Sequence, residues 1–361
     1  MTDTTKPGKR NAVSLIFVLC MIVLSVCLIF HKNDWQTVMD TAAALRPMWI
    51  AAAFGCWIAH VMTDALILYI QLRKHQPVGY LYALYVTVMG SFYCAITPGS
   101  SGGQPMQVYY LSKRKVPLGV STSVLSVKFA VGQISTVLIT LILGLLCQPL
   151  MRRRMAEFRW LIRLGWIVHL GGVLLILMAV FCKRTVHKLA DCLIKYGSKL
   201  RILRNTVSFA SKCHNTIESY HANIHEALKR PKEICGHMLL SAFSLLFVML
   251  IPACIYQAFG LHGTGWKELL ITAYMLYLSA SYNPFPGASG AQEGGFLVFY
   301  RGVFPSGQIS MAMFAWRFFT YYLHLICGAL LMLMDSGRHF FGHRKNKAAV
   351  PDHNSESMTV F

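Results

Sequence analysis

Six apolar stretches, each close to the roughly 20 residues that a helix needs to cross a lipid bilayer, recur along the chain. They lie at about 12–30, 48–70, 117–147, 160–182, 237–260 and 309–334. Because lipid offers the backbone no hydrogen bonds, a stretch of this kind spans the membrane as a helix. The composition agrees, since 55% of the 361 residues are hydrophobic and 13% are charged. The sequence therefore predicts an all-α polytopic membrane protein with about six full spans.

Two further apolar segments, 80–112 and 267–300, are interrupted by proline and glycine. Five of seven aligned positions in the interruptions are identical: Pro98, Gly99, Ser101, Gly102 and Gln104 match Pro286, Gly287, Ser289, Gly290 and Gln292. Interrupted segments at corresponding places in two halves point to the substrate site of a transporter built from repeats. The alternative is a pair of unrelated loops, because short Gly/Pro/Ser strings also recur by chance.

Basic residues orient the chain, whose net charge is +20. The basic N-terminus is expected in the cytoplasm by the positive-inside rule. Basic residues at 73–74 and 113–115 flank both ends of the first interrupted segment, which should therefore enter and leave from the cytoplasm as a re-entrant hairpin. The last span must end at a basic tail, so the second hairpin should enter from outside. One hairpin from each face makes two halves of inverted topology. The arginines at 152–154 are an exception, because this topology places them outside.

The expected organisation has four parts. A first membrane half, 1–182, carries the motif at 97–105, and a second half, 237–336, carries the motif at 283–295. Between them lies a basic cytoplasmic segment, 183–236, with eleven Lys and Arg against four Asp and Glu, and a cytoplasmic tail covers 337–361. Within 183–236, apolar Leu189, Leu193 and Ile194 beside Lys188 and Lys195 predict an amphipathic helix that lies on anionic lipid headgroups. The alternative is a solvated linker.

Ionisable residues inside the spans are expensive in lipid and are expected to face the bundle interior. Lys128 and Arg317 are the cations, and Asp64 and Glu293 are candidate partners. His60 and Asp64 lie one helical turn apart, either as functional groups or as a structural pair. The hairpin tips offer free backbone N–H groups and helix N-termini after Gly103 and Gly290, which would suit a phosphate group. An alternative for Arg317 and Glu293 is a salt bridge that only joins the halves.

Signatures of enzyme chemistry are missing: the sequence has no P-loop, HExxH or GxSxG motif. The eleven cysteines mostly lie in or beside apolar stretches without the spacing of metal ligands, which indicates free thiols. We therefore expect no catalytic residue, metal or cofactor. The basic charge reflects topology and lipid contact, so nucleic acid is not an expected partner.

The pairing of TPGSSGGQPMQVYYLSKR at 97–114 with NPFPGASGAQEGGF at 283–296, followed by WRFFTYY at 316–322, resembles the lysylphosphatidylglycerol synthase transmembrane family. A well-known member is the flippase portion of the bacterial multiple peptide resistance factor. By similarity, the residues on the recurrent positions of the family are Pro98, Gly99, Gly102, Gly103, Pro286, Gly287, Gly290, Glu293, Arg317 and Tyr321. Many relatives carry an acidic residue where this chain has Gln104. The resemblance implies movement of an aminoacylated or otherwise modified phospholipid between leaflets, which lowers negative surface charge and resists cationic peptides.

Together these observations predict a lipid translocator of the bacterial cytoplasmic membrane with both termini in the cytoplasm. The expected substrate-binding residues are Pro98, Gly99, Ser101, Gly102, Gly103, Gln104, Lys128, Pro286, Gly287, Ser289, Gly290, Gln292, Glu293, Arg317 and Tyr321, with His60 and Asp64 as further candidates. One alternative is the membrane part of a phosphatidylglycerol lysyltransferase, because full-length relatives add a C-terminal synthase domain that we expect this chain to lack. A second is a small-solute secondary transporter. Expected partners are membrane phospholipid, a separate synthase protein and a second copy of the chain.

Overall fold

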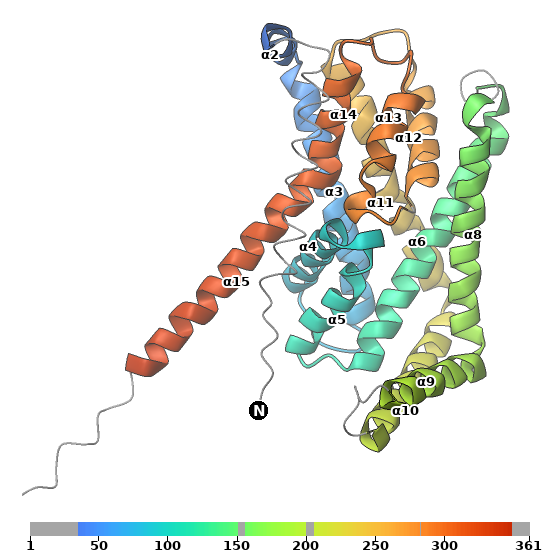
Figure 1. Ribbon diagram of the computed structural model, residues 1–361, viewed down its shortest axis with the longest axis vertical. Helices are drawn as coiled ribbons and strands as arrows, with labels where there is room; N and C mark the ends of the chain where they lie inside the picture. The colour runs from blue at the N-terminus through green and yellow to red at the C-terminus, as the bar shows by residue number, and fades with distance from the viewer. Residues whose placement is uncertain (1–34, 151–155, 200–205, 282, 349–361) are drawn as a thin grey trace, which may run out of the picture.

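The computed structural model describes residues 35–150, 156–199, 206–281 and 283–348, and this part of the chain is helical without a β-strand (Figure 1). Five stretches are long and apolar enough to cross a membrane. They are α3 (Pro47–Leu72), α6 (Leu118–Leu146), the Ala156–Leu175 stretch that begins α8 (Arg159–Phe181), α11 (Pro231–Ala258) and Ile309–Asp335. The all-α polytopic prediction is confirmed. The first predicted span, 12–30, and the arginines at 152–154 lie outside the described residues.

Both interrupted segments form helical hairpins. The first consists of α4 (Tyr80–Ile96), the short turn η1 (Pro98–Ser100) and α5 (Gly103–Lys113). The second consists of α12 (Trp266–Ala280), η3 (Pro286–Ala288) and α13 (Ala291–Phe299). The first hairpin rises from the lower end of the bundle in Figure 1, the second descends from the upper end, and their tips meet in the middle. This is the inverted arrangement that the sequence predicts.

Helices α3 and α11 form an antiparallel pair beside the hairpins. At the upper end the Arg46 N–H donates to the carbonyl of Ala258 at 2.9 Å, and at the lower end Lys74 pairs with Glu233. Close helix contacts elsewhere depend on small residues, as is common in membrane bundles. A Cβ on Gly165 of α8 would lie 2.5 Å from the Leu278 carbonyl oxygen of α12. These contacts enclose the hairpins on several sides.

Each hairpin has its own apolar core. The upper cluster surrounds α12 and α13 and includes the fully buried Phe296 and Tyr300, while the lower cluster surrounds α4 and α5 and includes Met89 and Leu111. The outward faces of α6 and α8 instead expose large apolar side chains: Leu145, Leu146, Trp160, Ile167, Leu174 and Leu175. An exposed apolar belt of this kind marks a surface that lipid covers. The buried clusters and the lipid-facing belt together define a membrane bundle around a central point where the hairpins meet.

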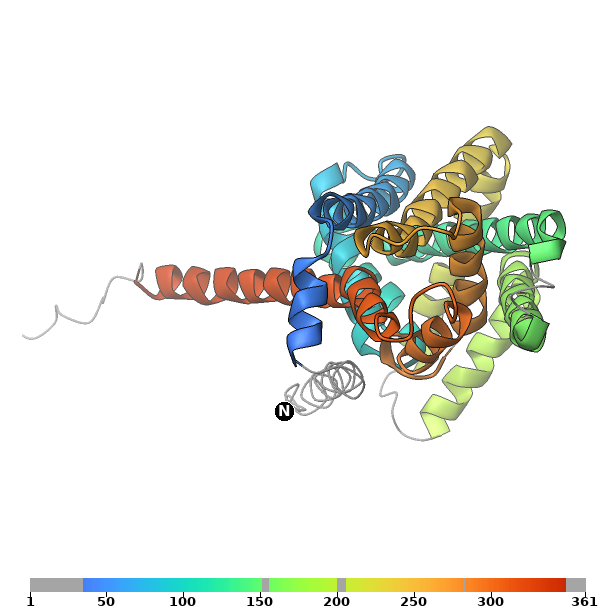
Figure 2. The same cartoon turned by 90° about the horizontal axis from the view of Figure 1, so that it is seen from above.

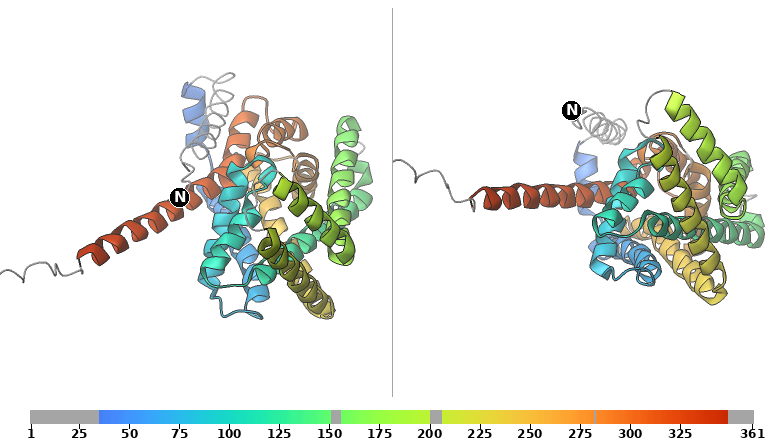
Figure 3. Two further views of the ribbon diagram at one scale, coloured as in Figure 1. Left: turned by 60° about the horizontal axis from the view of Figure 1, so that its bottom comes forward. Right: turned by 90° about the horizontal axis from the view of Figure 1, so that it is seen from below.

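The described residues of 183–230 form the helices α9 (Lys183–Lys199) and α10 (Thr206–Leu228), which lie across the lower end of the bundle (Figure 3). Ile194 is buried while Lys188 and Lys195 are exposed, as expected for an amphipathic helix. α10 packs on the start of α6, where a Cβ on Gly119 would lie 2.4 Å from the Ser219 hydroxyl. The segment is therefore a docked helical pair rather than an extended linker.

The last predicted span, 309–334, agrees with the Ile309–Asp335 stretch, but its helix is irregular and continues beyond the span. It begins as α14 (Ile309–Arg317), continues through η4 (Phe318–Tyr322), a π-helical turn, and extends as α15 (Leu323–Ala348). α15 therefore runs past the predicted boundary at 336 and projects away from the bundle (Figure 2). A short helix, α2 (Trp35–Ala43), precedes α3, and a turn, η2 (Ala156–Phe158), precedes α8.

Candidate functional site

A cavity of about 890 Å³ lies between the two hairpin tips, with further walls from α3, α6, α8, α11 and α15. Eleven of the predicted site residues line it: His60, Asp64, Gly99, Ser101, Gly103, Gln104, Lys128, Gly287, Gln292, Arg317 and Tyr321. Six do not: Pro98, Gly102, Pro286, Ser289, Gly290 and Glu293. The sequence therefore located the cavity, but it did not distinguish the residues that face it from those that shape the tips behind it.

The two tips share an unusual backbone turn. Gly99 and Ser100 have φ values of 57° and 55°, and the matching Gly287 and Ala288 have 61° and 52°. Two consecutive residues in the left-handed region are rare, particularly when the second is not glycine. The repeat seen in the sequence is thus also a repeat of conformation. The similarity of the two backbones ends three residues after the first glycine, because Gly290 has a φ of 85° whereas the matching Gly102 has −81°.

The tips touch each other directly and through Tyr321. The Gly99 N–H donates to the Pro284 carbonyl at 3.1 Å. The Tyr321 hydroxyl donates to the Ala95 carbonyl of α4 at 3.2 Å, and its ring covers Gly287, where a Cβ would lie 2.0 Å from a ring carbon. One side chain therefore bridges both hairpins. The π-helical turn η4 presents this ring, and such turns often occur at functional sites.

Arg317 and Glu293 form a deeply buried ion pair, with 2.8 Å between Nε and Oε1 and 4% and 7% of the side chains exposed. Arg317 Nη2 also donates to the Gly287 carbonyl at 3.1 Å and the Ser289 hydroxyl at 3.3 Å. Its guanidinium lies 4.3 Å from the centre of the Tyr321 ring. Arg317 touches the cavity, but it is already engaged by the second tip. The expectation that Glu293 faces the cavity is wrong.

Glu293 has a second partner that explains its position. Its Oε2 accepts the N–H of Gly290, the N-cap of α13, at 2.7 Å. The carboxylate thereby occupies the positive end of the helix, where an anionic ligand would otherwise bind. The start of α5 differs, since its first turn carries Gln104 and no acidic residue, and both Gly103 and Gln104 line the cavity. The two tips are therefore alike in backbone and unlike in charge.

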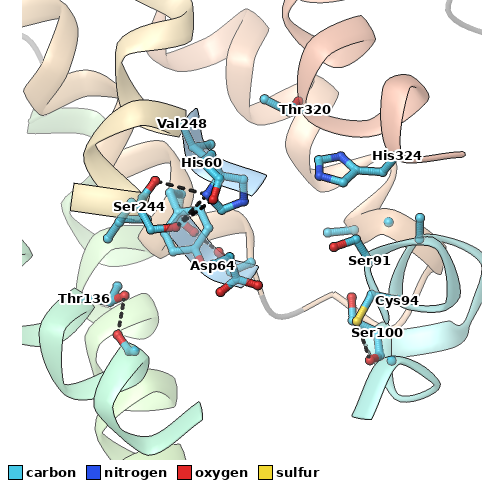
Figure 4. A pocket seen from close by; sticks show the side chains of 18 of the residues that line it. His60, Asp64, Ser91, Cys94, Ser100, Thr136, Ser244, Val248, Thr320 and His324 are labelled. Carbon is cyan, nitrogen blue, oxygen red and sulfur yellow. Dashed lines mark hydrogen bonds between the residues drawn. The ribbon is translucent and has the colours of Figure 1, made fainter. Parts of the chain in front are cut away.

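The second membrane cation, Lys128 of α6, pairs with Asp64 of α3 at 2.7 Å. Their side chains remain 14% and 29% exposed, and both line the cavity. His60 does not form a hydrogen bond with Asp64, which was one of the two alternatives, but lies 2.9 Å from the Ser244 hydroxyl of α11. Figure 4 shows His60, Asp64 and Ser244 together, with His324 of α15 across the cavity. Ser244 and His324 were not among the residues predicted from the sequence.

His324 was detectable, because it lies within an apolar span directly after the WRFFTYY motif, and an ionisable residue there is a functional candidate by default. Its ring is 6.3 Å from that of His60 and 5.6 Å from that of Trp57. Ser244 gave no signal, since a serine in an apolar helix is ordinary. Deeper in the cavity, His169 lies 2.9 Å from the Gln133 amide oxygen.

Within the described residues, no three His, Cys, Asp or Glu side chains are grouped so that they could hold a metal ion. The nine cysteines in this part of the chain are free thiols. The cavity presents the Lys128–Asp64 ion pair, the Arg317 guanidinium, hydrogen-bonding side chains such as Gln104, Gln133 and Thr136, and the first turn of α5.

Comparison with known proteins agrees with this architecture. A UPF0104 membrane protein of Archaeoglobus fulgidus is 24% identical over 267 residues, which cover 70% of this chain and 76% of that protein. A family model described as the lysylphosphatidylglycerol synthase TM region matches residues 11–328, which include both hairpins and Arg317. The chain therefore belongs to the lysylphosphatidylglycerol synthase TM region family.

Proposed function

We infer that the protein moves a phospholipid between the two leaflets of the membrane, with the head group passing through the cavity between the hairpin tips. The observation that carries this proposal is a cavity between two inverted hairpins, inside an apolar bundle, that contains charged and hydrogen-bonding side chains. A head group is too polar to cross hydrocarbon alone, and a cavity of about 890 Å³ is of the size that encloses a small ligand. Membership of the family supports a role in lipid handling.

Among lipids, we favour an aminoacylated or otherwise modified anionic phospholipid such as lysyl-phosphatidylglycerol. The phosphate of such a lipid would lie near Lys128 and the first turn of α5, where the cation and the helix dipole both favour an anion. Export of this lipid would reduce negative surface charge and contribute to resistance against cationic antimicrobial peptides. The setting would be a bacterial cytoplasmic membrane, with both termini inside.

The contacts between the tips suggest how access could alternate. Each hairpin enters from its own end of the bundle. The Gly99–Pro284 hydrogen bond joins the two tips, and the Tyr321–Ala95 hydrogen bond joins η4 to the first hairpin. Rocking of one hairpin against the other would open the cavity toward one leaflet at a time, as in other inverted-repeat transporters. The basic helix α9 would meanwhile rest on anionic headgroups.

Purified protein in sealed vesicles tests the proposal. Head-group-labelled lysyl-phosphatidylglycerol is placed in both leaflets, and its accessibility to a membrane-impermeant reagent is followed over time. Faster transfer than in protein-free vesicles supports the proposal. Incorporation of lysine from lysyl-tRNA into phosphatidylglycerol, without transfer, would instead assign a lysyltransferase role. Uptake of soluble amino acids without lipid transfer would assign a solute carrier. Adding a candidate synthase protein, and measuring the mass of the purified assembly, tests the expected protein partners.

A further inference from the structure

The two ion pairs inside the bundle differ in exposure and in their contacts with the hairpin tips. The difference indicates that one pair is structural and that a ligand could reach the other. The Arg317–Glu293 pair has less than a tenth of either side chain exposed, and both residues hold backbone groups of the second tip. The Lys128–Asp64 pair is more exposed, at 14% and 29%, and both residues face the cavity. No hydrogen bond from Lys128 or Asp64 to either tip is found among the described residues. The second pair is therefore free to exchange partners without disturbing the hairpins.

The charge of the cavity restricts which ligand could make that exchange. Within the described residues, the lining side chains of Lys, Arg, Asp and Glu are Asp64, Lys128 and Arg317 alone, and Glu293 already neutralises Arg317. A ligand with only a negative charge would take Lys128 from Asp64 and leave a carboxylate unpaired in a low-dielectric site, which is costly. A ligand that carries one positive and one negative group can replace both partners at once. The one positive and one negative side chain of the Lys128–Asp64 pair therefore suit a ligand that carries both charges.

The surroundings of each charge indicate where the two groups of the ligand would bind. On the Lys128 side, Gly103 and Gln104 of the first turn of α5 line the cavity, and the dipole of this helix favours an anion such as a phosphodiester there. On the Asp64 side, the imidazole rings of His60 and His324 line the cavity, and a ring nitrogen can accept a hydrogen bond from an ammonium group. Both sets of groups line the same cavity.

We propose that Asp64 and Lys128 form an exchangeable ion pair that opens to bind a phospholipid head group carrying both an ammonium and a phosphodiester, with Asp64 receiving the ammonium and Lys128 the phosphodiester. The assignment deepens, and rests on, the proposed lipid function. It makes Asp64 the residue that separates amine-bearing head groups from purely anionic ones. Arg317, by contrast, holds the second tip in place.

Binding in detergent tests the subsite without transport. Short-chain phosphatidylethanolamine and lysyl-phosphatidylglycerol are the amine-bearing probes, short-chain phosphatidylglycerol is the anionic probe, and the readout is the lipid concentration that raises the unfolding temperature. The native protein should bind the amine-bearing probes at least about tenfold more tightly than phosphatidylglycerol, a difference of ~1.4 kcal/mol. Asp64→Asn should remove this preference. Equal binding of all probes by the native protein, or an unchanged preference in Asp64→Asn, overturns the proposal.

Two sets of variants keep the result interpretable. The double variant Asp64→Asn with Lys128→Met leaves no unpaired charge, so it should fold even if Asp64→Asn alone does not. It should likewise bind amine-bearing and anionic probes equally, and a retained preference would refute the assignment. Lys74→Gln and Glu233→Gln are matched controls, because they remove a lysine–carboxylate pair between α3 and α11 that does not line the cavity. They should keep the native preference.

The vesicle assay then distinguishes failure of the subsite from failure of the function. If Asp64-dependent binding is found but no lipid is transferred by the native protein, the subsite stands and the translocation proposal fails. If lipid is transferred at the native rate by Asp64→Asn with no change between amine-bearing and anionic lipids, translocation stands and the subsite assignment fails.

Discussion

Replacement of Arg317 by alanine is the perturbation whose consequence follows most directly from the structure. The change leaves the Glu293 carboxylate, 7% exposed, with the Gly290 N–H as its remaining bond, and it removes the donors to the Gly287 carbonyl and the Ser289 hydroxyl. Breaking a buried ion pair by removing one partner costs about 3–5 kcal/mol. The second tip should loosen, so both stability and lipid transfer should fall.

A series of variants isolates the cause. Arg317→Lys keeps the charge but loses the planar fork that binds the carboxylate and two oxygens of the tip, so its loss of stability should be intermediate. Arg317→Met with Glu293→Gln leaves no unpaired charge and should cost less than Arg317→Ala. Glu293→Gln alone completes the double-mutant cycle.

Denaturant unfolding in mixed detergent micelles measures these differences, and the vesicle assay measures transfer for the same preparations. The reasoning would be refuted if Arg317→Ala were as stable as the native protein, or if the double variant were no more stable than Arg317→Ala. In either case the pair would contribute little, and Arg317 would act only through packing against Tyr321.

Two further predictions concern the tip and the topology. Gly287→Ala should destabilise the protein and slow transfer, because the new Cβ would lie 2.0 Å from the Tyr321 ring at a φ of 61°. The control Gly171→Ala, whose Cβ would have no atom within 4 Å, should be tolerated. Equal melting temperatures of the two variants would contradict this prediction. In a cysteine-depleted background, cysteines placed at Lys115 and Arg301 should react with an impermeant thiol reagent from opposite sides of the membrane, with the first reached from the cytoplasm, and labelling of both from one side would refute the inverted hairpins.

Much of the site was predictable because the bilayer imposes strict conditions on the backbone. A Pro/Gly interruption is tolerated in an apolar segment only where protein or water lines it. The motifs at Pro98 and Pro286 therefore had to lie inside the bundle, away from lipid. The charges of Lys128 and Arg317 had to be paired for the same reason. The sequence did not identify the partner of Asp64. It placed His60 one helical turn away, whereas in the structure Asp64 pairs with Lys128 of another helix and His60 contacts Ser244.

The sequence by itself determined the elements, the repeat and the opposed entry of the hairpins, because hydrophobic length, backbone hydrogen bonding and the distribution of basic residues are local properties of the chain. Only the tertiary structure decided which charges remain available to a ligand. Glu293 binds the start of its own helix and Arg317, so the second tip is neutralised, while Lys128 and Asp64 meet across two helices with their side chains toward the cavity. That difference depends on packing between distant segments, which no local pattern in the sequence specifies.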